Sequence, residues 1–479
     1  MHCTRLCALL SCVLLIVLSA TDAGAAKTKP KTKAPSASAA YRFERGGWTY
    51  VHLAGTPAEI GYQHGQLLSA EIVDLIRVNK LELEHGTHRN WEFFREAGRK
   101  MLWPHIEAEY QQELEGIARG ARSKGAKLDV WDVVALNGAI ELSEYYVPWL
   151  DKHTHAENAP TIHPRGRCSA FIATGSYTKD GRIVVAHNNW SSYADGERWT
   201  IIFDIKPAHG HRMVMDGEPG VITSEDDFGL NDAGLMITET TITQFAGWSE
   251  QGIPEFVRSR KAMQYAGSID EYVALMKQGN NGGYANDWMI GDRKSGEIAY
   301  LELGLKNTPV WRSKDGYFIS SNFARDPALI KDETDGFDPT NLASSPNARR
   351  VTWEDKMAQS KGHIDVELAE QFLGSHEDSY TGKVNADSRS LCGHIDRDEK
   401  GIPEWEDPPF YPDGAVTGKV TDSELAAHLG MIARAGHPCG EDFLVDPFME
   451  AHPEFKYLKP ILKDMKAGPW TAFRAGESR

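Results

Sequence analysis

The sequence predicts an α+β fold in which blocks of helices flank blocks of strands. Helical patterns dominate residues 41–150, strand patterns follow one another from Ser169 to Ile242, and a helix and further strands follow between Ser268 and Leu303. Such blocks predict α+β layers, because βαβ units would alternate strand and helix regularly. We find no internal repeat and no glycine-rich phosphate-binding motif.

The first 40 residues predict an exported protein. Residues 1–26 combine Arg5, an apolar run from Leu9 to Leu18 and small residues at 23–26, which is the layout of a cleavable signal peptide. Residues 27–40 are rich in Lys, Pro, Ser and Ala and predict a flexible linker. We therefore expect a periplasmic, secreted or lysosome-like location. No later apolar run reaches the roughly 20 residues that cross a bilayer, so no stable membrane insertion is expected.

Composition indicates a globular enzyme with an acidic surface. The 479 residues are 41% hydrophobic and 25% charged, which is enough to bury a large core. The net charge is −16 and becomes about −20 without residues 1–40, which argues against nucleic acid as a partner. Three cysteines would remain after export: Cys168, Cys392 and Cys439. We expect Cys168 to stay free, while Cys392 and Cys439 either pair or are unrelated buried thiols.

Helix signals define a mainly helical amino-terminal fragment, residues 41–167. Thr56, Pro57 and Glu59 form the start signal of a helix that continues to Ile76, with a cap, a proline at the first helical position and an acid at the third. Further helical patterns run from Trp91 to Gly120 and from Asp129 to Tyr146.

Strand signals dominate after Pro164. Ser169–Thr174 and Arg182–His187 are short apolar runs joined by a turn at Lys179-Asp180-Gly181, and they predict a hairpin. Ser268 begins a capped helix. The other predicted strands are Trp199–Ile205, His211–Asp216, Val221–Ser224, Gly234–Ile242, Trp288–Ile290 and Ile298–Leu303.

Cys168 is the candidate nucleophile because it begins a strand directly after a polar, proline-containing stretch. A cysteine freed at its amino side carries an α-amine with a pKa of about 8, which can accept the thiol proton near neutral pH. A lone cysteine in a strand is more often a small buried hydrophobe. His153, His155 and His163 precede it without a recognised metal-ligand spacing, so we expect a cleaved loop there and no metal.

Six motifs after Cys168 resemble the phospholipase B-like family and occur in that family's order. They are CSAFI at Cys168, HNNWSSY at His187, PGVITSEDDF at Pro219, GLMITETT at Gly234, YANDWMIGD at Tyr284 and GKVTDSELA at Gly418. The resemblance implies a four-layer αββα N-terminal-nucleophile hydrolase sandwich whose catalytic chain is residues 168–479. The segment Gly55–Gly65 is similar to acyltransferases that process penicillin precursors, which share the cysteine chemistry.

The resemblance also implies roles for single residues. Cys168 would be the nucleophile and Arg167-Cys168 the bond that the protein cleaves in itself, with the two fragments remaining associated. His187 would face the nucleophile, and Asn286 would donate to the oxyanion. Thr240 would bind the nucleophile or substrate through its hydroxyl. Arg349 or Arg350 would lie near the centre, and no cofactor or metal is implied.

These observations predict a hydrolase of acyl amide or ester bonds in lipid-like substrates. An acyltransferase or amidase of the penicillin-acyltransferase type differs only in the acceptor, which the sequence does not identify. A non-catalytic binding protein would keep an uncut chain. A papain-like protease fits less well, because a helix after the cysteine is missing.

Overall fold

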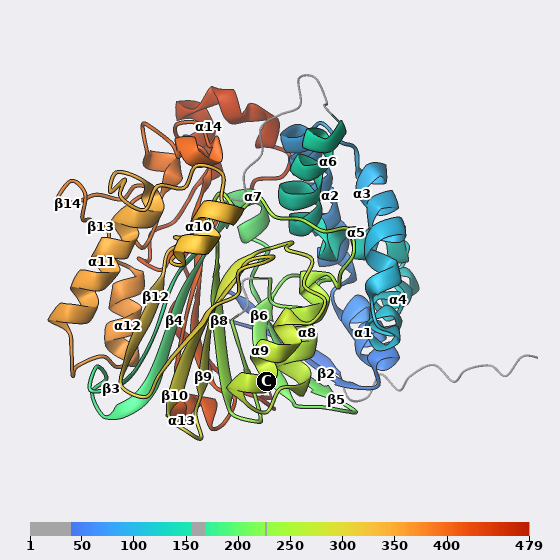
Figure 1. The fold of residues 1–479 in the computed structure, drawn as a ribbon. Coiled ribbons are helices and arrows are strands. Elements are labelled where there is room, and N and C mark those ends of the chain that lie inside the picture. The colour runs from blue at the N-terminus through green and yellow to red at the C-terminus, as the bar shows by residue number, and fades with distance from the viewer. Residues whose placement is uncertain (1–39, 155–167, 226–227, 479) are drawn as a thin grey trace, which may run out of the picture. The chain divides into compact units, whose positions relative to one another are not determined.

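The computed structural model describes residues 40–154, 168–225 and 228–478, which fall in one compact unit (Figure 1). It is an α+β protein with several sheets, so the predicted fold class is confirmed. The predicted signal peptide, Arg167, His155 and His163 lie outside the described residues. None of the described helices is both long and apolar enough to cross a membrane.

Two large sheets form the centre of the protein. The nine-stranded sheet pairs, in this order, β1 (Tyr41–Arg45), β2 (Trp48–Gly55), β5 (Ile201–Pro207), β6 (Met213–Gly217), β7 (Gly229–Asn231), β8 (Leu235–Thr241), β9 (Asn286–Asp292), β10 (Glu297–Leu303) and β11 (Val310–Ser313). The six-stranded sheet pairs β12 (Gly316–Ser320), β3 (Cys168–Gly175), β4 (Gly181–Ser192), β15 (Asp413–Asp422), β16 (Met431–Ala435) and β17 (Thr471–Phe473). Only the β2–β5 pair in these two sheets is parallel. The short strands β13 (Glu377–Asp378) and β14 (Lys383–Val384) form a separate pair.

The helices fall into groups along the chain. The amino-terminal group contains α1 (Pro57–Leu67), α2 (Ser69–Thr87), α3 (Trp91–Ala97), α4 (Ala108–Ser123), α5 (Val130–Asn137) and α6 (Val147–Thr154). The later helices are α7 (Tyr193–Gly196), α8 (Glu255–Tyr265), α9 (Ile269–Lys277), α10 (Pro327–Glu333), α11 (Ser345–Gln359), α12 (Val366–Leu373), α13 (Ser423–Ala426) and α14 (Val445–Ala451).

Apolar side chains of the two sheets pack against each other. Ala170 and Ile172 of β3 belong to one buried cluster with Met236 of β8 and Met289 of β9. The opposite faces of the strands pack on helices, since successive side chains in a strand alternate. Phe171 contacts Trp353 of α11, and Figure 1 shows α11 and α12 beside β3, β4 and β12.

The amino-terminal fragment is helical only after residue 55. We predicted that residues 41–150 are mainly helical. Residues 41–55 instead form β1 and β2, because β2 joins the nine-stranded sheet by pairing with β5. The capping box at Thr56 and Glu59 is confirmed. The predicted run from Trp91 to Gly120 is broken by a π-helical turn at Gly98–Leu102 and by a 3-10 turn that contains Pro104.

The hairpin that begins at Cys168 is confirmed. β3 and β4 are antiparallel, with Ala170 opposite His187, and Gly181 has φ +81 at the turn. Ser268 caps α9 as predicted, and its side chain accepts from the main chain of Glu271. The predicted strand Val221–Ser224 is wrong. Hydroxyl groups in this segment bond to Ser259 and Asp216 and hold it in an irregular bend.

Candidate active site at Cys168

Cys168 is buried at the start of β3, where the two large sheets meet. It is 1% exposed, and its β4 partner in the register is Asn189. One candidate ligand atom each of Cys168, His187 and Glu239 lies within 4.8 Å of the other two. The structure thus brings Cys168 and His187 together as the motifs implied. Glu239, on β8 of the other sheet, was missed, although it stands next to Thr240 in the ETT motif.

Arg349 on α11 holds the main chain of the candidate nucleophile. Its Nη1 atom donates to the carbonyl oxygen of Cys168 at 2.7 Å and to the Ser169 hydroxyl at 3.0 Å. The guanidinium lies 4.2 Å from the centre of the Trp190 ring, a cation–π contact. Burial lowers the pKa of Arg349 to about 9, while Cys168 acts in the opposite direction. Arg350 instead pairs with Glu354 one turn further along α11.

Asn322 is a second contact of Cys168 that the sequence analysis missed. Its Oδ1 atom accepts from the main-chain nitrogen of Cys168 at 3.3 Å and from Arg349 Nη2 at 2.9 Å. Its Nδ2 atom donates to the carbonyl oxygen of Thr241. Asn322 has φ +74, a conformation that asparagine tolerates better than most residues. The available signal was an asparagine two residues after the strand Gly316–Ser320.

Thr240 lies on a buried polar chain beside β3. Its hydroxyl donates to Ser320 at 2.5 Å, and Ser320 donates to Asp287 at 2.9 Å. Ser320 stands opposite Ala170 in the sheet register. Burial, and then the charge of Glu302, raises the pKa of Asp287 well above its usual range, so this carboxyl group favours the protonated state. The hydroxyl of Thr240 is therefore linked through Ser320 to the buried carboxyl group of Asp287.

Asn286 is fully buried at the start of β9. It lies opposite Thr241 of β8, whose carbonyl oxygen binds Asn322. Neither polar atom of its side chain has a hydrogen-bond partner within the described part of the chain. A buried amide without a partner is costly, so each such group calls for an explanation. A carbonyl oxygen that becomes negatively charged during a reaction would be a hydrogen-bond partner for the amide nitrogen.

The other candidate residues from the sequence, His153, Cys392 and Cys439, lie outside the cluster at Cys168. His153, on α6, contacts the carbonyl oxygen of Trp149 through Nδ1. Cys392 and Cys439 are both free thiols and lie near two histidines. The four side chains have the composition of a metal site, as does the set Cys168, His187 and Glu239.

A cavity of about 350 Å³ extends between the amino-terminal helices and the carboxy-terminal half. Its lining combines apolar side chains such as Leu83 and Trp405 with acids such as Glu144 and Asp195. Trp405 donates to the Thr243 hydroxyl at 2.7 Å, and the main chain of Thr243 donates to Asn322. Two hydrogen bonds thus connect the cavity wall to the residue that binds Cys168.

The fold and the site together define an α+β protein with a buried cysteine, histidine and glutamate cluster between two sheets. Residues 81–302 match a family model described as Phospholipase B. The curated relatives include the putative phospholipase B-like 2 of Mus musculus, 33% identical over 146 residues, which cover 27% of this chain and 24% of that protein. They also include the putative phospholipase B-like 3 of Caenorhabditis elegans, 29% identical over 158 residues, which cover 30% of this chain and 27% of that protein.

An uncharacterized protein of Archaeoglobus fulgidus is 27% identical over 307 residues, which cover 59% of this chain and 48% of the archaeal protein. The chain is therefore a relative of the phospholipase B-like proteins, and the resemblance indicated by the sequence motifs is confirmed. It spans about half or less of the length of these curated relatives.

Proposed function

We propose that this chain is an exported cysteine hydrolase of the N-terminal-nucleophile type, which cleaves itself between Arg167 and Cys168. It would then hydrolyse acyl amide or ester bonds in lipid-like substrates, in line with the hydrolase-like function that its phospholipase B-like relatives suggest. Sheets that face each other and carry helices on their outer faces support the four-layer αββα arrangement. The proposal rests on the position of Cys168 at the first residue of β3, with its main-chain nitrogen bound to Asn322.

The contacts of Cys168 suit a nucleophile that carries its own base. After cleavage, the α-amine would remain beside the Asn322 amide oxygen, which accepts one of its protons and orients its lone pair. The Arg349 guanidinium bonds to the same oxygen, and a nearby positive charge lowers the pKa of an amine. The amine would then be unprotonated near neutral pH and ready to accept the thiol proton.

The reaction would proceed in two steps. The Cys168 sulfur attacks the acyl carbon, its proton passes to the α-amine, and that proton then goes to the leaving amine or alcohol. Water next attacks the thioester and gives a proton to the amine, while the sulfur leaves and regains its proton. In both steps the carbonyl oxygen becomes negatively charged, and the buried Asn286 amide is the donor that we assign to it.

The two fragments would remain associated after cleavage. β2 belongs to residues 41–167 and pairs along its length with β5 of residues 168–479. The Nε2 atom of His64 on α1 accepts from the main chain of Gly220 at 2.8 Å. Separating the fragments would expose a sheet edge and much of the apolar core, so association is favoured.

The cavity lined by Trp405 is the region that we assign to the substrate. Its apolar side chains suit a hydrocarbon chain, whereas its acids repel an anionic group and favour a neutral or cationic one. The substrate class that fits is a fatty acyl amide or ester without a free anionic group near these acids.

A second mechanism is favoured by the position of His187. A histidine and a glutamate beside a cysteine form the arrangement of a thiol hydrolase in which imidazole is the base. Such an enzyme would not require a free α-amine at Cys168. The two mechanisms therefore differ in whether the active protein has been cut.

Amino-terminal sequencing and intact mass of purified active protein test the proposal. We expect two fragments with Cys168 at the start of the second, and a full-length Cys168→Ala variant. Active wild type that stays uncut would overturn the self-cleavage mechanism and favour His187 as base. Hydrolysis by the Cys168→Ala variant at the wild-type rate would reject both.

A further inference from the structure

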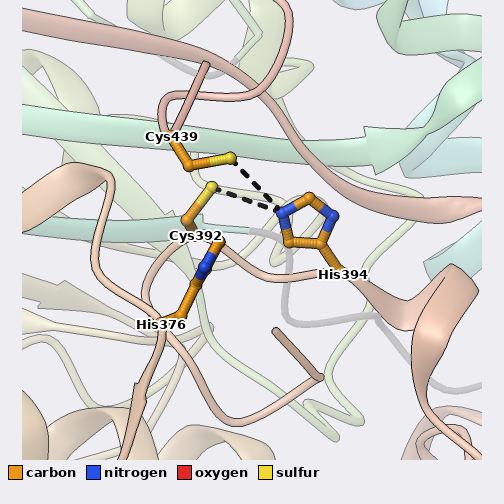
Figure 2. Close-up of side chains that lie close together, drawn as sticks. All are labelled: His376, Cys392, His394 and Cys439. Atoms are coloured by element: carbon orange, nitrogen blue, oxygen red, sulfur yellow. Dashed lines mark hydrogen bonds between the residues drawn. The ribbon is translucent and has the colours of Figure 1, made fainter. Parts of the chain in front are cut away.

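Four side chains that the proposed reaction does not use converge in the carboxy-terminal half of the chain. They come from three separate segments: His376 follows α12, Cys392 and His394 precede β15, and Cys439 follows β16. One donor atom of each lies within 4.8 Å of the others. Figure 2 shows both sulfurs facing the same nitrogen of His394, with His376 beside Cys392. The sulfur distances to His394 Nε2 are 3.7 Å from Cys392 and 3.6 Å from Cys439.

The surroundings of the cluster are buried, and a carboxylate lies beside one of its histidines. Nε2 of His394 faces the sulfurs, and its Nδ1 atom lies 3.7 Å from the Asp396 carboxylate, which is ion-pair distance but longer than a hydrogen bond. A carboxylate on this side of the ring is common for metal-bound imidazoles. Asp396 is itself fixed by the Tyr193 hydroxyl at 2.6 Å. The Nε2 atom of His376 is shielded from solvent. Cys392 and His394 are themselves buried.

We infer that His376, Cys392, His394 and Cys439 bind one zinc ion in a closed, four-coordinate structural site. Two thiolates and two imidazoles form a ligand set typical of structural zinc, and soft sulfur with imidazole disfavours calcium and magnesium. Binding would release the two thiol protons to solvent. With four protein ligands, no position remains for water or substrate, so the ion would stabilise structure and would not catalyse.

A disulfide between Cys392 and Cys439 is the competing arrangement. It would use the two sulfurs alone and would leave the convergence of two histidines on them unexplained. Both thiols are free in this structure. The spacing of the ligands along the chain follows no familiar zinc motif, which explains why the site could not be recognised from local patterns.

The zinc site would stabilise the position of Arg349, which binds Cys168, through the Trp190 ring. The main chain of Leu391, next to Cys392, accepts from Asn188 and from Trp190 of β4. The Trp190 ring packs so closely on Gly393 that a Cβ atom there would lie 2.1 Å from it. Because Arg349 lies over the same ring and binds Cys168, an ordered loop at Cys392 would keep Arg349 in place.

Metal analysis of the full-length protein, purified without chelators, tests this inference. We expect about one zinc per chain, and at least about a tenfold lower content in Cys392→Ser. Cys168→Ala is the matched control and should keep its zinc. If Cys168→Ala loses the metal while Cys392→Ser retains it, the ion belongs to the cluster at Cys168 and the inference is wrong.

Cobalt titration of the metal-free wild type keeps the inference testable if Cys392→Ser does not fold. Thiolate ligands give Co²⁺ strong near-ultraviolet charge-transfer absorption, which we expect at one equivalent, together with a higher melting temperature. Absence of this absorption under reducing conditions would overturn the inference. Peptide mapping that finds a Cys392–Cys439 disulfide in the active protein would also overturn it.

Discussion

Arg349 donates a 2.7 Å hydrogen bond from Nη1 to the carbonyl oxygen of Cys168, although 181 positions separate the two residues. The same guanidinium reaches Asn322, which binds the main-chain nitrogen of Cys168. One buried cation thus contacts the carbonyl oxygen of Cys168 directly and its main-chain nitrogen through Asn322.

Replacing Arg349 should destabilise the protein far more than replacing its neighbour. Arg349→Met removes the guanidinium donor from two buried acceptors, the carbonyl oxygen of Cys168 and the amide oxygen of Asn322, and we expect a loss of about 3 kcal/mol in the free energy of unfolding. Arg350→Met removes a partly exposed pair with Glu354 and a 5.8 Å contact with the Phe323 ring, and should cost about 0.5 kcal/mol. Urea unfolding in a Cys168→Ala background measures both, and equal losses would contradict the assignment.

Removing the Asn322 side chain should reduce turnover while preserving the backbone. Asn322→Gly keeps the positive φ and deletes the amide that we expect to orient the α-amine, so turnover should fall by about 100-fold. Gln244→Gly is the control, since Gln244 also has a positive φ but bonds Asp335 at the surface. Unchanged turnover in Asn322→Gly would remove this residue from the site.

Asn286→Ala should lower activity without lowering stability. The side chain makes no hydrogen bond within the described part of the chain, so its loss breaks none there. An oxyanion donor is nevertheless worth about 100-fold or more in turnover. Asn231→Ala is the contrast, because Asn231 makes three internal bonds and should cost about 2 kcal/mol. Thermal melts and turnover of both variants decide whether Asn286 is functional.

Acid should weaken the contact between His64 and the main chain of Gly220. Burial lowers the pKa of His64 to about 3, and the charge of Arg260 adds to this. Since the folded pKa lies below the ordinary 6.5, the stabilisation is present above pH 6.5 and is lost as pH falls toward 3. Between pH 7 and pH 4 we expect a loss of about 3 kcal/mol from this group.

His64→Gln should remove this part of the pH dependence, because glutamine does not titrate and its amide oxygen can still accept from Gly220. Exposed His428→Gln serves as the control. Stability measured across pH 4 to 7 is the readout, and identical profiles for wild type and His64→Gln would show that His64 does not contribute.

Local patterns predicted the elements that depend on neighbouring residues. The caps at Thr56 and Ser268 and the hairpin from Cys168 to His187 formed as expected, since each is decided within a few residues. The strand predicted at Val221–Ser224 failed, because side-chain bonds to Ser259 and Asp216 compete with strand pairing there.

The site residues Glu239 and Asn322 were not predicted for a different reason. Glu239 and Asn322 become notable only when β8 and the loop after β12 meet the start of β3, and no local pattern encodes that meeting. β2 was mistaken for part of a helical region because its partner, β5, lies beyond Cys168. From the sequence, Cys392 and Cys439 were either a pair or unrelated buried thiols, and only the fold brings two histidines to them.

Local patterns and motifs in the chain were therefore enough to indicate the α+β class and the relation to phospholipase B-like proteins, and that resemblance identified the cysteine on which the proposed reaction depends. The tertiary structure alone selected Arg349 over Arg350, brought Glu239 to Cys168 and assembled the candidate zinc ligands. The physical reason is that hydrogen-bond and metal-ligand geometry act over a few ångströms in space, whereas the residues concerned are far apart along the chain.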